Sequence, residues 1–75
     1  MTFTVEIASV PDREDLVAEI WADTELMAEL RYDEGELRVQ LYAPPGGRSW
    51  DVPFDQLASV LQLARQKLGP PTGKS

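Results

Sequence analysis

The segment from Asp51 to Gly69 constrains the fold most, because its start, its period and its end all indicate one α-helix. Pro53 suits a first helical turn, where its missing N–H is not needed. Asp51 or Asp55 places a carboxylate where it can cap the free amides of that turn. Gly69 suits a left-handed C-cap, and the two prolines that follow it prevent the helix from continuing.

The apolar residues of this segment recur at steps of three and four, which is typical of one buried helix face. This stripe consists of Phe54, Leu57, Ala58, Leu61, Ala64 and Leu68. Val60 and Leu63 fall beside the stripe and widen it. We expect the helix to close a hydrophobic core, because a partner-binding helix could draw only on Val60 and Leu63.

The size and composition of the chain exclude several classes of protein. A chain of 75 residues forms one domain, and such a domain buries only around 60% of its unfolded surface, which leaves little room for a deep substrate pocket. The absence of cysteine excludes disulfides and thiolate metal sites, and it fits a reducing cytosol. The absence of histidine removes the commonest general base and metal ligand.

The charge of the chain points to a particular kind of partner. The formal net charge is −6, from 13 acidic and 7 basic residues, which disfavours binding to nucleic acid or to an anionic membrane and suits a basic protein. The N-terminal residues lack the pattern of a signal peptide, and no stretch approaches the roughly 20 apolar residues of a membrane span. We therefore expect a cytoplasmic protein.

The first half of the chain predicts strands, with one ambiguous stretch. Residues 2–8 alternate between apolar and polar side chains, as a half-buried strand does. Residues 9–15 carry a proline and four charges and are predicted to form a loop. Residues 16–33 fit either two strands or a helix that begins near a capping-box pattern at Ser9 to Asp12. We favour strands, because a helical stripe would have to pass through the small or polar residues 22–25.

The middle of the chain contains the clearest hairpin signal. Asp33, Glu34 and Gly35 form a tight-turn sequence, which predicts a hairpin between residues 26–33 and 36–43. A looser turn rich in proline and glycine follows at residues 43–47. Residues 48–52 are predicted to form one further short strand.

Together these elements predict an α+β fold: a small antiparallel β-meander of four to five strands, with one C-terminal α-helix packed on one face. Residues 1–69 are predicted to form a single domain and residues 70–75 a flexible C-terminal tail. The expected core consists of Phe3, Val5, Ile7, Leu16, Ile20, Leu26, Leu30, Leu37, Val39, Leu41, Trp50, Val52, Phe54, Leu57, Leu61 and Leu68.

No motif in the sequence indicates catalysis, a cofactor or a metal site. The tail sequence GPPTGKS resembles a phosphate-binding loop, but its glycine spacing is one residue too short and no strand precedes it. Two acidic clusters, at residues 12–15 and 33–36, lack the spacing of a calcium-binding loop. The serines have no histidine to activate them.

The sheet face opposite the helix is the candidate binding surface. Its predicted partner-binding residues are Trp21, Met27, Glu29, Arg31, Arg38, Gln40 and Tyr42. Aromatic, methionine and arginine side chains are typical of contact surfaces. Ordinary cross-strand pairing of these residues is the alternative interpretation. An exposed edge strand could also pair with a second copy of the chain or with a target strand.

We therefore expect a non-catalytic, small acidic protein-interaction domain. Its most concrete form is an immunity-like or antitoxin-like inhibitor of a basic partner. The alternative is a structural homodimer that buries Trp21, Met27 and Tyr42 and has no other ligand. A small enzyme or metal binder is a third hypothesis.

Overall fold

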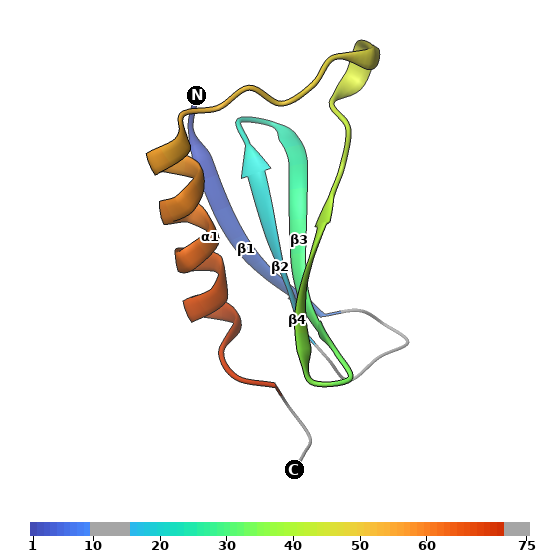
Figure 1. Ribbon diagram of the computed structural model, residues 1–75, viewed down its shortest axis with the longest axis vertical. Coiled ribbons are helices and arrows are strands. Elements are labelled where there is room, and N and C mark those ends of the chain that lie inside the picture. Colours follow the sequence, from blue (N-terminus) through green and yellow to red (C-terminus); the bar gives the residue numbers. More distant parts are fainter. Residues whose placement is uncertain (10–15, 72–75) are drawn as a thin grey trace.

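The computed structural model describes residues 1–9 and 16–71 and confirms the predicted α+β fold. A four-stranded antiparallel sheet carries one α-helix on one of its faces (Figure 1). The strands lie side by side in chain order, and their bounds are β1 Phe3–Ser9, β2 Leu16–Ala22, β3 Glu25–Asp33 and β4 Glu36–Leu41. A short 3-10 turn, η1 (Pro45–Gly47), leads to the helix α1 (Phe54–Leu68).

The ambiguous stretch forms strands, as predicted, and not a helix. Ala18, Ile20 and Ala22 of β2 alternate with more exposed neighbours and are almost completely buried. This period of two matches a strand with one face on the core. β2 pairs with both β1 and β3, so it lies inside the sheet.

The predicted hairpin between β3 and β4 is also confirmed. Asp33 and Glu36 face each other across the turn. The two residues between them both have positive φ, 54° at Glu34 and 82° at Gly35. Positive φ at both central residues is the type I′ geometry, whose twist matches that of the flanking strands.

One irregularity in the sheet changes which residues are buried. Ile20 is opposite Ala28, whereas Trp21 is opposite Leu26, so Met27 is an extra residue on β3. This β-bulge shifts the alternation of β3 by one residue. As a consequence Met27 is only 2% exposed and belongs to the core, whereas the sequence pattern placed it on the open face.

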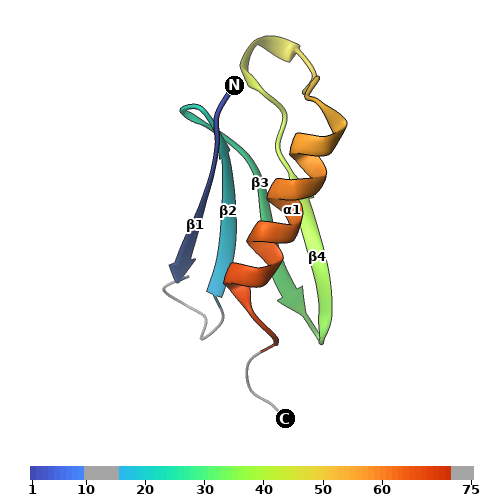
Figure 2. The ribbon, with the colours of Figure 1, turned by 90° about the vertical axis from the view of Figure 1, so that its left-hand side faces the viewer.

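The core lies between α1 and the first three strands (Figure 2). α1 packs mainly against β2 and β1 and less closely against β3. Between α1 and β4, both fully described, there is no close backbone contact. The buried cluster consists of Ala18, Ile20, Ala22, Met27, Ala28, Leu30, Val60, Ala64 and Leu68.

The off-centre position of α1 corrects the predicted core. Phe54, Leu41 and Val39 were expected inside, but they are 79%, 71% and 46% exposed. Ile7 and Leu16 are exposed as well. α1 covers β1 and β2, so the apolar residues of β4 have no helix above them. The buried side of α1 is centred on Val60, Ala64 and Leu68. The apolar stripe predicted from the sequence was centred on a different side of the helix, which includes the exposed Phe54.

The two ends of α1 differ in how well the sequence predicted them. Gly69 ends the helix as expected, with φ 79° and an N–H that donates to the Arg65 carbonyl at 3.1 Å. At the other end, Pro53 is the N-cap and no side chain caps the amides. The capping role predicted for Asp51 or Asp55 is therefore wrong.

The predicted fifth strand at residues 48–52 does not form. This segment instead crosses the end of the sheet and leads into α1 (Figure 1). Pro44, Pro45 and Pro53 bracket it, and proline cannot donate to a β-ladder. Trp50 fixes the segment, because its indole N–H donates to the Tyr42 carbonyl at 2.6 Å.

Candidate protein-binding surface

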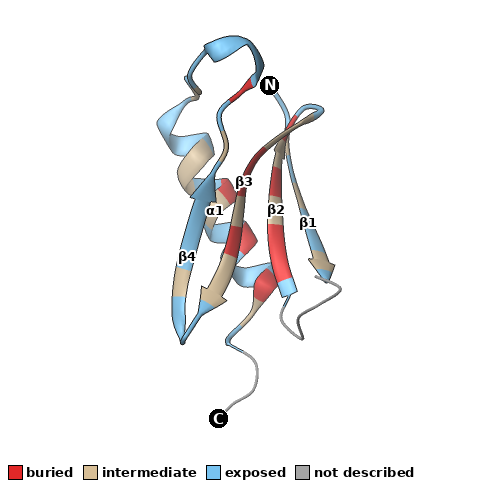
Figure 3. Ribbon diagram, turned by 90° about the vertical axis from the view of Figure 1, so that its right-hand side faces the viewer, coloured by how far each residue is buried: buried red, intermediate tan, exposed pale blue. Residues whose placement is uncertain are grey.

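The open face is the surface of the sheet opposite α1, and it faces the viewer in Figure 3. The residues of β1 and β2 that contact the core alternate with those that point to the open face. The same alternation runs through β3 beyond the bulge and through β4. The open face comprises Thr4, Glu6, Ala8, Val17, Glu19, Trp21, Glu29, Arg31, Arg38 and Gln40, with Tyr42 just after β4.

Three glutamates form a row across the open face. Glu6 lies directly opposite Glu19, and Glu19 lies directly opposite Glu29. Neighbouring strands are about 4.8 Å apart, so the three side chains start from adjacent positions on the same face of the sheet. Like charges directly opposite each other destabilise a sheet. We call these three residues the glutamate row.

Aromatic side chains hold two members of the glutamate row. The Trp21 indole N–H donates to Glu19 Oε1 at 3.2 Å. The Tyr42 hydroxyl donates to Glu29 Oε1 at 3.0 Å. Partial burial raises the pKa of Tyr42, and the hydrogen bond to Glu29 and the charge of that carboxylate raise this pKa further. The phenol therefore stays protonated and keeps donating at neutral pH.

The two arginines of the open face bind residues outside the glutamate row. Arg31 donates to Gln40 at 3.0 Å, and Arg38 forms an ion pair with Glu36 at 3.0 Å. Arg31 and Arg38 are themselves opposite each other. Within residues 1–9 and 16–71, no lysine or arginine lies within ion-pair distance of the glutamate row.

The structure brings most of the predicted partner-binding residues to one surface. Met27 is the exception, because it is buried within the chain. Glu29 and Gln40 face each other, as do Arg31 and Arg38. The hydrogen bonds from Arg31 to Gln40 and from Tyr42 to Glu29 agree with the cross-strand pairing that was the alternative interpretation of this face.

The glutamate row could not be predicted as a unit from the sequence. Alternation places Glu6 and Glu19 on the polar side of their strands. Their alignment with Glu29 depends on the register of three strands, which the pattern of a single strand does not contain.

The acidic side chains of the described residues do not gather into a metal site. In the ranges 1–9 and 16–71, no three acidic side chains converge on a point where they could hold a metal ion. In the same ranges no polar or charged side chain is buried. The acidic cluster at residues 12–15 and the last four residues of the GPPTGKS tail lie outside the described residues.

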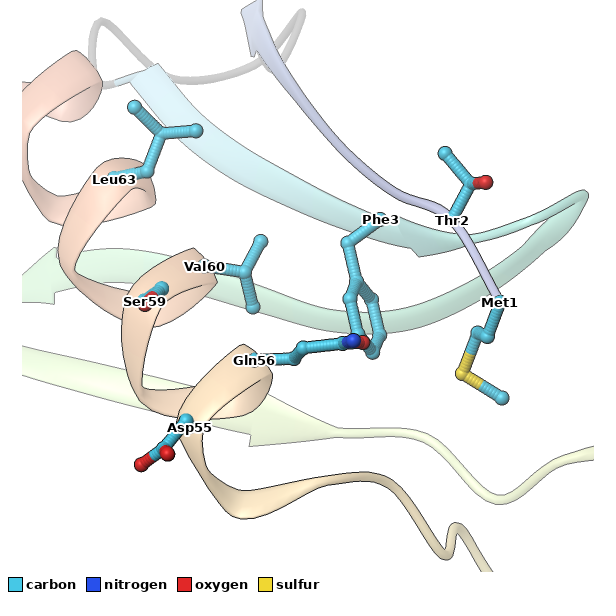
Figure 4. Close-up of a pocket in the computed structure, with 8 residues that line it drawn as sticks. All are labelled: Met1, Thr2, Phe3, Asp55, Gln56, Ser59, Val60 and Leu63. Carbon is cyan, nitrogen blue, oxygen red and sulfur yellow. The ribbon is translucent and has the colours of Figure 1, made fainter.

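One hollow lies between the start of β1 and α1, beside Phe3, Gln56 and Val60 (Figure 4). Its volume is about 520 Å³ and it is widely open to solvent. Asp55 and Ser59 line the hollow from α1, and the chain has no histidine that could activate the Ser59 hydroxyl.

Comparisons with protein-family models, with curated protein sequences and with solved structures find no match to this chain. In the described part of the chain, no helix has the length and apolar character that crossing a lipid bilayer requires.

Proposed function

We propose that the protein is a non-catalytic interaction domain that binds a basic protein partner through its open face. An immunity-like or antitoxin-like inhibitor of a basic toxin is the most concrete form of this function. A net charge of −6 suits such a partner through electrostatic steering. The absence of cysteine fits a cytoplasmic site of action.

The glutamate row is the observation that carries the proposal. Glu19 lies between Glu6 and Glu29, an arrangement that disfavours the folded state of the isolated chain. A lysine or arginine side chain from a partner would relieve this repulsion and form charge-assisted hydrogen bonds. Binding and relief of the unfavourable contact would then occur in the same step.

The aromatic neighbours support the same function. Trp21 and Tyr42 hold Glu19 and Glu29 by hydrogen bonds, so less side-chain entropy is lost when a partner binds. Both rings are only half-buried and provide apolar contact area beside the carboxylates. Cations also bind well over the face of an indole ring.

The proposed function is non-catalytic for chemical reasons. The chain has neither histidine nor cysteine, so the usual nucleophile–base pairs are excluded. Paired carboxylates do acid–base work only where their environments separate their pKa values. The glutamate row lies on the face of the sheet opposite α1, and no polar or charged side chain of the described residues is buried there.

A titration observed by NMR tests the proposal. The probe is a synthetic peptide in which arginine alternates with serine, added to the ¹⁵N-labelled protein. The two indole N–H signals provide an internal comparison, because Trp21 contacts the glutamate row and Trp50 contacts the Tyr42 carbonyl. We expect the Trp21 signal to shift, the Trp50 signal to stay in place, and the affinity to fall as salt is raised.

Matched variants make the titration decisive. Replacing Glu6, Glu19 and Glu29 together by glutamine should weaken binding by at least about tenfold, which corresponds to 1.4 kcal/mol. The control replaces the exposed residues Glu34, Asp51 and Asp55 by their amides, which removes the same charge away from the open face. Equal losses in both triple variants would show attraction by net charge alone and would refute a binding site at the row.

A further inference from the structure

The helix-side surface of β4 carries apolar side chains that the core leaves uncovered. Leu41 is 71% exposed and Val39 is 46% exposed, and both point to the side on which α1 lies. Phe54, at the start of α1, is 79% exposed. β4 is also an edge of the sheet, so its outer backbone groups have no strand partner in the described chain. An exposed apolar edge strand is a template for pairing with another strand.

The backbone of β4 shows which groups face outward. The Tyr42 N–H donates to the Met27 carbonyl at 2.9 Å, so the N–H of Tyr42 points toward β3. Hydrogen-bonded and non-hydrogen-bonded pairs alternate along an antiparallel ladder. Leu37, Val39 and Leu41 therefore point their N–H and C=O groups away from β3, toward the free edge. These are the same residues whose side chains lie on the helix side.

We propose that β4 pairs with β4 of a second copy of this chain, antiparallel about a two-fold axis at Val39. The outward residues read Leu37, Val39, Leu41, which is a palindrome about Val39. In this register Val39 meets Val39 of the second copy, and Leu37 meets Leu41 of the second copy. Each of these pairs can form two backbone hydrogen bonds, so every outward group of β4 obtains a partner.

Charge selects the same register. An axis at Val39 places Arg38 opposite Gln40 of the second copy, with no like charges facing each other. An axis at Arg38 would place two arginines opposite each other, which is unfavourable. An axis at Gln40 would pair Leu37 with Ala43 of the second copy, which lies beyond the end of β4. Only the Val39 register satisfies all the outward groups of the strand.

The other edge of the sheet is a weaker candidate. β1 also presents outward backbone groups, but its helix-side residues Phe3 and Val5 already pack against the core beneath α1. Less apolar surface therefore remains for a second copy at β1. Pairing through β4 leaves the open face uncovered, so the dimer does not depend on the proposed function.

Sedimentation equilibrium tests the dimer. We expect the wild-type chain to form dimers and Val39→Lys to weaken them by at least about tenfold, because two like charges would meet at the axis. Ile7→Lys is the matched control, since Ile7 is a similarly exposed helix-side residue on the other edge strand. It should leave the dimer unchanged. Loss of the dimer in Ile7→Lys alone, or a wild-type chain that stays monomeric throughout, would overturn the proposal.

The effect of salt distinguishes the proposed dimer from the proposed binding of a basic partner. Each copy carries a net charge of −6, so added salt screens the repulsion between copies and should maintain or strengthen the dimer. Binding of the basic peptide should weaken under the same conditions. A dimer that dissociates as salt rises would contradict pairing through the apolar side of β4.

Cysteine cross-linking tests the register independently of dimer strength. The chain contains no cysteine, so a single substitution gives a unique thiol. In Val39→Cys the two Cα atoms would lie about 5.5 Å apart, within the disulfide range. In Leu41→Cys the equivalent atoms would lie about 14 Å apart, four residues along the strand. We expect rapid oxidation to a covalent dimer only in Val39→Cys, and equal rates or a faster Leu41→Cys would overturn the register.

Discussion

At the scale of single residues, Tyr42 connects three parts of the molecule. Its N–H donates to Met27 of β3, and its carbonyl accepts from Trp50 in the connection to α1. Its hydroxyl donates to Glu29 on the open face. The sequence pattern placed Tyr42 on the open face, but its link to Trp50 depends on the path of residues 43–53, which no local pattern contains.

Tyr42 makes the stability of the fold depend on pH in the alkaline range. Its pKa is raised in the folded state above the ordinary value of about 10, so the folded chain holds this proton more tightly than the unfolded chain does. The contribution of Tyr42 to the free energy of unfolding should therefore be fully present below about pH 10 and be lost as the pH rises through the folded pKa. Urea unfolding over this range should show a smaller fall in Tyr42→Phe than in the wild type.

The tyrosinate absorbance gives a direct control for this interpretation. In Tyr32→Phe the only remaining tyrosine is Tyr42, so its ionisation can be followed alone. A midpoint above the ordinary tyrosine value is expected. A midpoint at or below that value would mean that Glu29 does not hold the hydroxyl.

At the scale of elements, the β3–β4 turn shows a residue that suits its position poorly. Glu34 adopts φ 54°, a conformation that residues other than glycine, asparagine and aspartate seldom adopt. Gly35 follows it with φ 82°, which glycine adopts without strain. The type I′ turn that these angles define is the one that Asn-Gly favours.

Glu34→Asn should therefore stabilise the chain. The gain should be up to about 1 kcal/mol, because asparagine tolerates positive φ better than glutamate does. Chemical denaturation provides the measurement. Glu34→Gln is the control, since it removes the same charge and keeps the longer side chain. If both variants gain equally, relief of charge rather than turn geometry is the cause.

The elements differ in how far the sequence predicted them. Residues 25–41 contain their own turn residues and Gly69 ends the helix at residues 54–68, so the hairpin and the helix could be predicted locally. The bulge at Met27 and the exposure of Phe54 could not be predicted locally. The bulge depends on the register between β2 and β3, and the exposure depends on where α1 packs on the sheet. The same holds for the glutamate row, which needs the register of three strands.

At the scale of the whole molecule, one helix on a four-stranded sheet leaves two different surfaces exposed. The open face carries the glutamate row, and the helix side of β4 carries Val39 and Leu41. The first is acidic and the second apolar, so salt should affect their interactions in opposite directions. The two proposed interactions therefore use separate surfaces of the molecule.

The stability and the affinity of Glu19→Gln, measured together at low salt, test the proposed role of the glutamate row most directly. Glutamine keeps the acceptor oxygen for Trp21 and removes the charge between Glu6 and Glu29. We predict a free energy of unfolding higher by about 0.2–1 kcal/mol and a weaker affinity for the arginine–serine peptide, with neither change in Glu34→Gln. Unchanged or lower stability with undiminished affinity would contradict the account.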